Sequence, residues 1–181
     1  MNDQLSFLKL IAARLDSAGI PYMLTGSVAM SFYAEPRMTR DIDLVIECQL
    51  DSGPSIVDLF RKDCYISPEA VGEAISGYGM FNIIHLDSIM KADFIVRKES
   101  EFRQVEFARK KSIVVDGYEF SVVTVEDLFL SKLQWWKESE STMQQSDLNL
   151  LKTHAKDLDW DYISNWATRL HLETWLEKLD K

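Results

Sequence analysis

Two aspartates separated by one residue stand in a short apolar stretch and could hold a divalent cation. Asp41 and Asp43 alternate with Ile42 and Leu44, which predicts a strand over 41–46 whose two carboxylates leave the same face, with Cα atoms about 6.6 Å apart. Carboxylates at this spacing repel each other, so a cation between them stabilises their ionised forms. Hard oxygen ligands without a nearby Cys or His suit Mg²⁺. Alone, however, such a motif is more often a solvated strand edge or a salt-bridge site.

A glycine turn comes before this pair along the chain. Gly26 and Ser27 lie between an expected strand at 22–24 and an expected helix at 28–33. Glycine lets a ligand approach the backbone closely, and the start of a helix offers free N–H groups to an anion. The alternative is an ordinary serine N-cap. Taken together, the turn and the aspartate pair predict an anion site and a metal site on neighbouring strand ends.

The remaining pattern predicts the elements that must position these residues. Residues 3–18 have helical periodicity, and 54–76 form two helical pieces, with Pro68 at the start of the second. From Met80 onward a meander of short strands is then expected at 81–86, 92–96, 105–108, 112–115 and 118–123. The last two strands are joined through Asp116 and Gly117 as a hairpin.

The final third of the chain is predicted to be helical. Thr124 and Asp127 form a capping pattern, and further helices are expected at 142–156, 159–169 and 172–179. We expect these residues on inward faces: Leu148, Leu151, Trp160, Ile163, Trp166 and Trp175. Trp135 and Trp136 are interpreted as core anchors. The fold class is therefore α/β (α+β): a mixed β-sheet flanked by helices (residues 1–123) with a C-terminal helical bundle (124–181).

Composition limits the partners. With 181 residues, 20 Lys+Arg against 29 Asp+Glu and a formal net charge of −9, the chain opposes non-specific contact with nucleic acid or an anionic membrane. Basic residues concentrate only within 97–111, either as an RNA contact or as a solvated hairpin. Cys48 and Cys64 are expected to be reduced thiols. The amphipathic start and an interrupted charge-free window at 17–34 indicate neither secretion nor a membrane span, so a cytoplasmic location is expected.

The two motifs resemble the nucleotidyltransferase superfamily typified by DNA polymerase β. The matching segments are Leu24-Thr25-Gly26-Ser27 and Asp41-Ile42-Asp43-Leu44, although Thr25 is polar where an apolar residue is commoner. The resemblance implies the nucleotidyltransferase-type mixed sheet and a third carboxylate on a later strand. Asp93 is the best match for that carboxylate. Three other acids fit less well: Glu47, Asp87 and Asp116.

The wider pattern looks like the minimal bacterial branch that includes AbiEii-type toxins. In those proteins a lysine on a later helix is thought to reach the triphosphate, and Lys132 stands in that place; the alternative is an exposed helix lysine. One departure is Ser146, which precedes Asp147 where many such proteins carry a basic residue. This departure puts in doubt a full catalytic set or a substrate shared with those toxins.

The resemblance implies a Mg²⁺-dependent transfer of a nucleoside monophosphate from a nucleoside triphosphate to a hydroxyl. Asp41, Asp43 and Asp93 would be the catalytic and metal-binding acids, with Asp93 accepting the acceptor's proton. The phosphates would lie on four residues: Gly26, Ser27, Lys132 and Arg40, with Arg37 as a substitute for Arg40. The acceptor stays open between RNA, a protein and a small molecule, and an antitoxin partner is implied. The competing hypothesis is a catalytically idle scaffold that binds nucleotide or a protein partner.

Overall fold

A mixed β-sheet forms the centre of the molecule. The computed structural model describes residues 2–35, 39, 41–155 and 157–179. Its strands are β1 (Tyr22–Thr25), β2 (Asp41–Ile46), β3 (Cys64–Ile66), β4 (Met80–His85), β5 (Lys91–Val96), β6 (Lys111–Val115) and β7 (Tyr118–Val122). They form one seven-stranded sheet in the order β3-β4-β5-β2-β1-β7-β6. The parallel pair β2 and β5 lies at its centre, and β1 runs antiparallel to β2.

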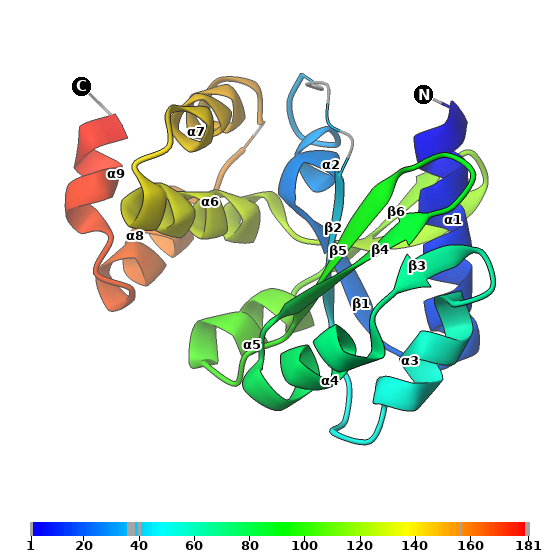
Figure 1. Ribbon diagram of the computed structural model, residues 1–181. Coiled ribbons are helices and arrows are strands. Elements are labelled where there is room, and N and C mark those ends of the chain that lie inside the picture. The colour runs from blue at the N-terminus through cyan, green and yellow to red at the C-terminus, as the bar shows by residue number, and fades with distance from the viewer. Residues whose placement is uncertain (1, 36–38, 40, 156, 180–181) are drawn as a thin grey trace.

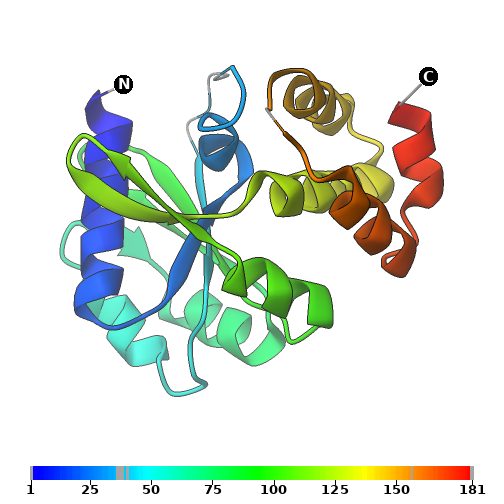
Figure 2. The ribbon, with the colours of Figure 1, turned by 180° about the vertical axis from the view of Figure 1, so that it is seen from behind.

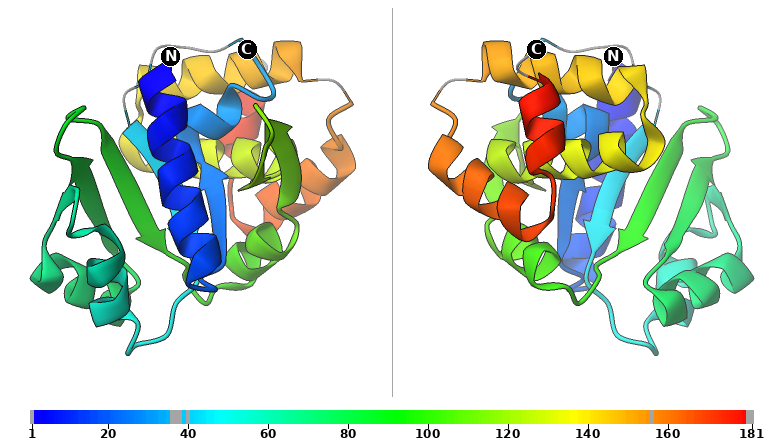
Figure 3. Two further views of the ribbon diagram at one scale, coloured as in Figure 1. Left: turned by 90° about the vertical axis from the view of Figure 1, so that its right-hand side faces the viewer. Right: turned by 90° about the vertical axis from the view of Figure 1, so that its left-hand side faces the viewer.

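Helices cover this sheet from two sides. They are α1 (Asn2–Ser17), α2 (Gly26–Met30), α3 (Gly53–Phe60), α4 (Pro68–Gly77), α5 (Glu101–Ala108), α6 (Val125–Ser139), α7 (Thr142–His154), α8 (Trp160–Arg169) and α9 (Glu173–Leu179). Figures 1 and 3 show α1 along one side of the sheet and the group α6 to α9 on the opposite side. Seen from behind in Figure 2, the chain passes from the β6–β7 hairpin directly into α6. The last four helices are therefore linked to the sheet by the short segment between β7 and α6.

The alternation along β2 separates a core face from an open face. Ile42 and Leu44 are fully buried, whereas Asp41 is exposed and Asp43 is partly exposed on the other face. This outcome confirms the predicted strand and its two-residue period. The open face of the sheet is where the candidate site lies.

Three predictions for the middle of the chain are wrong. The expected strand at 105–108 lies in helix α5, whose buried Phe102, Glu106 and Phe107 recur at helical spacing. β3 was not expected at all. The strands also do not form a meander, because β2 and β1 separate the β4–β5 pair from the β6–β7 pair. The hairpin through Asp116 and Gly117 is confirmed, and both residues have positive φ angles of 48° and 74°.

The helical end of the chain follows the prediction closely, with two exceptions. Four of the six residues expected on inward faces are buried, and Trp175 is partly buried, but Trp160 is 39% exposed. Trp136 is buried as a core anchor, whereas Trp135 is 49% exposed. Adjacent tryptophans on a helix point about 100° apart, so only one of the two can face the core.

Two expectations concern features outside the fold itself. Cys48 and Cys64 are both free thiols. Among the described residues, no helix combines the length and the apolar character that crossing a membrane requires.

Candidate active site

Four polar residues stand side by side across four strands of the open sheet face. Thr25 pairs with Asp43, Asp43 with Asp93, and Asp93 with Asn82. We call this set the carboxylate row. Since register partners in neighbouring strands point to the same face, the fold brings Asp93 next to Asp43 from about fifty positions away in the chain. Asp41 lies two residues before Asp43 on the same face, with Lys91 as its register partner.

The glycine turn lies directly against this row. Gly26 has a φ of +63°, and a Cβ built on it would lie 2.1 Å from Asp43 Oδ2 and 2.9 Å from Asp43 Cβ. A side chain at this position therefore collides with the whole Asp43 side chain, and only glycine lets the turn pass so close. The backbone N–H of Ser27 donates a hydrogen bond to the Asp43 carboxylate. Helix α2 itself has five residues instead of the expected six at 28–33 and begins at Gly26.

The environment of Asp43 disfavours its ionised form. Burial raises the pKa of this carboxyl above its ordinary value, and the neighbouring charge of Asp93 raises it further. The charge of Lys132 and the hydrogen bond from Ser27 act in the opposite direction and lower the pKa. The net direction is upward, so a cation at this site would relieve an existing electrostatic cost.

Asp93 is satisfied on one side only. Its Oδ2 lies 2.8 Å from the ammonium of Lys91, and this contact raises the pKa of Lys91. Its Oδ1 is buried and has no hydrogen-bond partner within the described part of the chain. A buried carboxylate oxygen without a partner is costly. In the same part of the chain, no three His, Cys, Asp or Glu side chains are gathered in an arrangement ready to hold a metal ion.

Lys132 is buried, which contradicts its interpretation as an exposed helix lysine. It is 5% exposed on α6, and its ammonium lies 2.7 Å from Asp147 Oδ2 on α7. Gln144 accepts a second, longer hydrogen bond of 3.5 Å from the same ammonium. Asp147 is 1% exposed, while its neighbour Ser146 faces solvent. The charge of Lys132 also acts on Asp43, so this ion pair stands at the edge of the carboxylate row.

The other candidates for the third carboxylate lie elsewhere. Glu47 is bound to Arg97 at 2.7 Å, Asp116 forms an ion pair with Lys9 in the hairpin, and Asp87 lies in the turn after β4. Arg40 and Arg37, which the sequence assigned to phosphate binding, lie outside the described residues.

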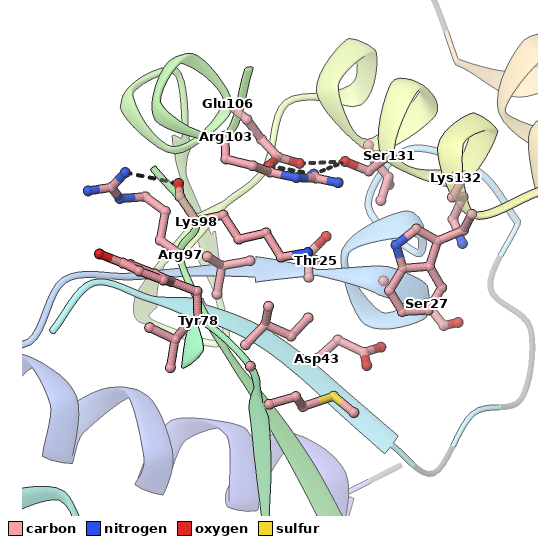
Figure 4. Close-up of a pocket in the computed structure, with 18 of the residues that line it drawn as sticks. Thr25, Ser27, Asp43, Tyr78, Arg97, Lys98, Arg103, Glu106, Ser131 and Lys132 are labelled. Atoms are coloured by element: carbon pink, nitrogen blue, oxygen red, sulfur yellow. Dashed lines mark hydrogen bonds and ion pairs between the residues drawn. The ribbon is translucent and has the colours of Figure 1, made fainter. Parts of the chain in front are cut away.

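A cleft of about 370 Å³ opens between the sheet and α6. Asp43, Gly26 and Ser27 line it from the sheet side, and Lys132 lines it from the helix. Figure 4 shows Asp43, Ser27 and Lys132 at one end of the cleft and Tyr78 and Arg97 at the other. Sequence reasoning had singled out the first end only.

The second end contains residues that the sequence did not reveal as part of a site. Arg103 on α5 binds Glu106 at 2.8 Å and Ser131 at 2.6 Å, and this network lies along the cleft wall in Figure 4. Burial raises the pKa of Glu106, against the opposing effect of Arg103. Tyr78 is half exposed at the cleft edge, and Trp135, which is also half exposed, lines the cleft from α6. The only sequence signal for this end was the charge concentration at 97–111.

That concentration does not form a free basic surface. Arg97 binds Glu47, Arg103 binds Glu106, and Arg109 binds Asp127 at 3.0 Å. Lys110 lies over the Phe107 ring at 4.1 Å. Three of the six basic residues at 97–111 are therefore neutralised by acids within the molecule, which weakens the RNA interpretation.

Comparison with known proteins identifies the fold through structure rather than sequence. No protein-family model matches the chain, and no curated protein matches its sequence. Among solved structures, an antigenic nucleotidyltransferase-like protein from Paracoccidioides brasiliensis superposes with a TM-score of 0.59 at 17% identity, covering 82% of this chain and 74% of that one.

Two antibiotic-modifying proteins are similar as well. ANT(2")-Ia in complex with adenylyl-2"-tobramycin gives a TM-score of 0.57 at 14% identity, covering 99% of this chain and 98% of the other. The lincosamide antibiotic adenylyltransferase LnuA, bound to lincomycin, gives 0.54 at 9% identity, covering 84% and 97%. These similarities confirm the predicted fold class: the chain has the nucleotidyltransferase-type fold, a seven-stranded mixed sheet flanked by helices.

Proposed function

We propose that this protein is a cytoplasmic, Mg²⁺-dependent nucleotidyltransferase that moves a nucleoside monophosphate from a nucleoside triphosphate to a hydroxyl group. One observation carries the proposal. The turn at Gly26 is pressed against Asp43, and Asp43 is in register with Asp93 on the next strand. The turn, which we propose binds phosphate, and Asp43 thus line one end of a cleft, and Asp93 lies beside Asp43 on the next strand. The similarity to adenylyltransferases over nearly the whole chain supports this function.

The carboxylates fit a divalent cation. Asp93 has a buried oxygen without a partner within the described residues, and Asp43 has a pKa raised by burial and by Asp93. Both features are costs that a bound cation removes, and carboxylate oxygens are the ligands that Mg²⁺ prefers. Although these three side chains are not gathered around one point in the structure, we propose that Asp41, Asp43 and Asp93 would hold the metal, which when bound supplies charge neutralisation at the reacting phosphate.

The protein's own groups have separable roles in this proposal. Gly26 and Ser27 present backbone N–H groups to the terminal phosphates, and Lys132 adds a charge that Asp147 keeps in place. Arg40 is proposed as a further phosphate contact. Asp93, the register partner of Asp43 on the neighbouring strand, is proposed to accept the proton from the acceptor hydroxyl.

A small-molecule acceptor has the best support among the three classes. The cleft volume of about 370 Å³ lies in the range of small-ligand sites, and two similar structures contain tobramycin and lincomycin. Three of the six basic residues at 97–111 are already paired with acids, which weakens the case for an RNA backbone as acceptor. A protein acceptor has no observation in its favour.

The decisive experiment incubates the protein with each α-labelled nucleoside triphosphate, Mg²⁺ and a fractionated cell extract. We expect label in the small-molecule fraction, its loss with EDTA, and its loss in Asp43→Asn. The matched control is Asp87→Asn, an acid in the β4–β5 turn, which should label like the wild type. Label in RNA or protein would correct the acceptor class, and equal labelling by Asp43→Asn would contradict the assignment of the site.

The idle scaffold keeps one observation in its favour. The ammonium of Lys91 binds Asp93 at 2.8 Å, and a permanent ion pair there would exclude both a metal and a proton transfer. In that case the protein would bind nucleotide without consuming it, and adding Mg²⁺ would not change the affinity. Calorimetric titration of the nucleotide with and without Mg²⁺ separates the two functions.

The AbiEii-type role is proposed from the sequence resemblance alone. A toxin of this kind arrests growth when it is expressed, and an antitoxin partner restores growth. Induction of the wild type and of Asp43→Asn in a bacterial host tests this role. Normal growth with the wild type would remove the toxin role but leave the nucleotidyltransferase proposal intact.

A further inference from the structure

The open sheet face carries a second set of register partners next to the carboxylate row. Val45 on β2 pairs with Ile95 on β5, and Ile95 pairs with Met80 on β4. We call these three residues the apolar row. They all line the cleft. Because they follow or precede the carboxylate row by two residues on each strand, the two rows are about 6.6 Å apart. A ligand whose reacting group lies at the carboxylate row can therefore contact the apolar row with the rest of its atoms.

Two half-exposed aromatic side chains line the same cleft as the apolar row. Trp135 is 49% exposed and Tyr78 is 44% exposed, and both line the cleft. Met80 is 58% exposed, whereas Val45 is buried and Ile95 is partly buried. Exposed apolar and aromatic groups gathered in a concave site are typical of ligand contacts.

The acids at this end are already neutralised. Glu106 is held by Arg103 and Ser131, and Glu47 is held by Arg97. Asp43 belongs to the metal and phosphate end. A ligand with several positive charges would thus find no carboxylate to bind along the apolar row.

One cation is available instead. Lys98 lines the cleft and is exposed, and it forms no ion pair with any described residue. Figure 4 shows its side chain reaching across the cleft toward Thr25, while Arg97 points away from the Asp43 end. Lys98 therefore contributes a positive charge, unpaired within the described part of the chain, to the cleft that the apolar row also lines.

From this arrangement we propose that the acceptor is a small, largely apolar hydroxyl compound with one anionic group, which lies on Val45, Ile95 and Met80 and pairs with Lys98. The inference rests on the proposed nucleotidyl transfer and names its acceptor class. It differs from a polycationic acceptor such as an aminoglycoside. The nucleoside part of a nucleoside triphosphate carries no charge, and its phosphates are assigned to Gly26, Ser27 and Lys132. The charge of Lys98 is therefore left for a second, anionic molecule.

Three phenols that share one ring and one hydroxyl test the charge preference. The probes are 4-hydroxyphenylacetate (anionic), 2-(4-hydroxyphenyl)ethanol (neutral) and tyramine (cationic), titrated by NMR into protein saturated with Mg²⁺ and α,β-methylene-ATP. We expect millimolar affinities, with the anion bound about three- to tenfold more tightly than the neutral probe and the cation most weakly. Tyramine bound as tightly as the anion, or no binding of any probe, would overturn the inference.

Variants assign the preference to its residues. Lys98→Met keeps the length of the side chain and should bring the anion to the affinity of the neutral probe, leaving the neutral probe unchanged. Met80→Gln should weaken all three probes by a similar factor, about two- to fivefold. Lys62→Met, which removes an exposed lysine after α3, is the control and should change nothing. An unchanged ratio between anion and neutral probe in Lys98→Met would overturn the role of Lys98.

The nucleotide distinguishes this inference from the function on which it rests. If the ATP analogue displaces the phenols, the apolar row takes the nucleobase, and the acceptor assignment is wrong. If the analogue itself does not bind, the proposed nucleotidyl transfer is wrong, and the acceptor assignment falls with it. Binding of the analogue together with the expected order of probes supports both.

Discussion

Two groups of buried acids in this protein differ in how their oxygens are satisfied. Asp127, at the start of α6, is fully buried, and its Oδ2 accepts hydrogen bonds from Thr124 Oγ1 at 2.6 Å and Arg109 Nε at 3.0 Å. Its Oδ1 accepts a hydrogen bond of 2.6 Å from the Tyr162 hydroxyl. In the carboxylate row, by contrast, Asp93 Oδ1 is buried without a partner within the described residues, and the pKa of Asp43 is raised.

The contrast separates a structural acid from a site acid. The contacts of Asp127 come from the end of α5, the start of α6 and helix α8, so they hold three elements together. The carboxylate row holds nothing comparable together and retains an electrostatic cost, which is typical of a functional site. Each prediction below tests one side of this contrast.

The largest effect is expected for Asp127→Ala. The substitution leaves Arg109, Tyr162 and Thr124 without their common acceptor, and such a loss in a buried network costs about 3–5 kcal/mol. For a chain of this size the melting temperature should fall by roughly 6–20 °C. Chemical denaturation measures the change in the free energy of unfolding, with Asp161→Ala, an exposed acid on α8, as the control. A loss below about 1 kcal/mol would show that Asp127 is not the structural centre of this region.

Gly26→Ala is expected to disturb both stability and binding. An alanine at φ +63° costs about 1–2 kcal/mol, and its Cβ would displace the Asp43 side chain, which lies within 2.1 Å. Nucleotide affinity should therefore fall by more than the loss of stability explains. Gly72→Ala is the matched control, because a Cβ there meets nothing within 4 Å and should be neutral or slightly stabilising. Unchanged nucleotide binding in Gly26→Ala would separate the turn from the site.

Asp43→Asn should stabilise the metal-free protein, the opposite of the Asp127 result. The folded protein raises the pKa of Asp43, so stability declines as the pH rises from the ordinary carboxyl pKa through the folded value. At pH 7.5 the variant should melt a few degrees above the wild type, about 3 °C, and the difference should shrink at pH 4. Mg²⁺ with ATP should raise the melting temperature of the wild type only. A variant less stable than the wild type at both pH values would contradict the electrostatic cost at Asp43.

The sequence predicted the features that depend on short spacing. The two-residue alternation at 41–46 and the turn at Gly26 and Ser27 are local patterns, and both were found as expected. The strand expected at 105–108 was wrong, because four residues with Val and Phe do not distinguish a strand from a helix. Its helical identity depends on the burial of Phe102 and Phe107 against the rest of the fold.

The features that depend on distant partners could not be read in this way. Asp93 was identified from the resemblance and not from spacing, since its place beside Asp43 follows from the parallel pairing of β2 and β5. The burial of Lys132 depends on Asp147, fifteen positions later on another helix. The division of the chain at residue 123 stays a prediction.

The smallest effect, and the one that sharpens the comparison most, is expected for Lys91→Met. Its ammonium binds Asp93 at 2.8 Å, and the Lys91 side chain is 36% exposed whereas that of Asp93 is 10% exposed, so the pair lies between a surface and a buried ion pair. Lys91 competes with any cation for Asp93, and its pKa is raised, so the lysine stays charged at neutral pH. Removing it should tighten Mn²⁺ binding about two- to fivefold, measured by calorimetry.

The control for Lys91→Met is Lys62→Met, which removes an equal charge away from Asp93. Any change in Mn²⁺ affinity in this control measures the effect of net charge alone. If Lys91→Met binds Mn²⁺ more weakly than this control, Lys91 orients Asp93 for the metal instead of competing with it. If neither variant binds Mn²⁺, Asp93 is not a metal ligand. The hypothesis of a catalytically idle scaffold is then favoured. Tighter Mn²⁺ binding in Lys91→Met alone would identify Asp93 as a site acid, in contrast to Asp127. A structural acid does not bind a metal ion more tightly when its ion-pair partner is removed.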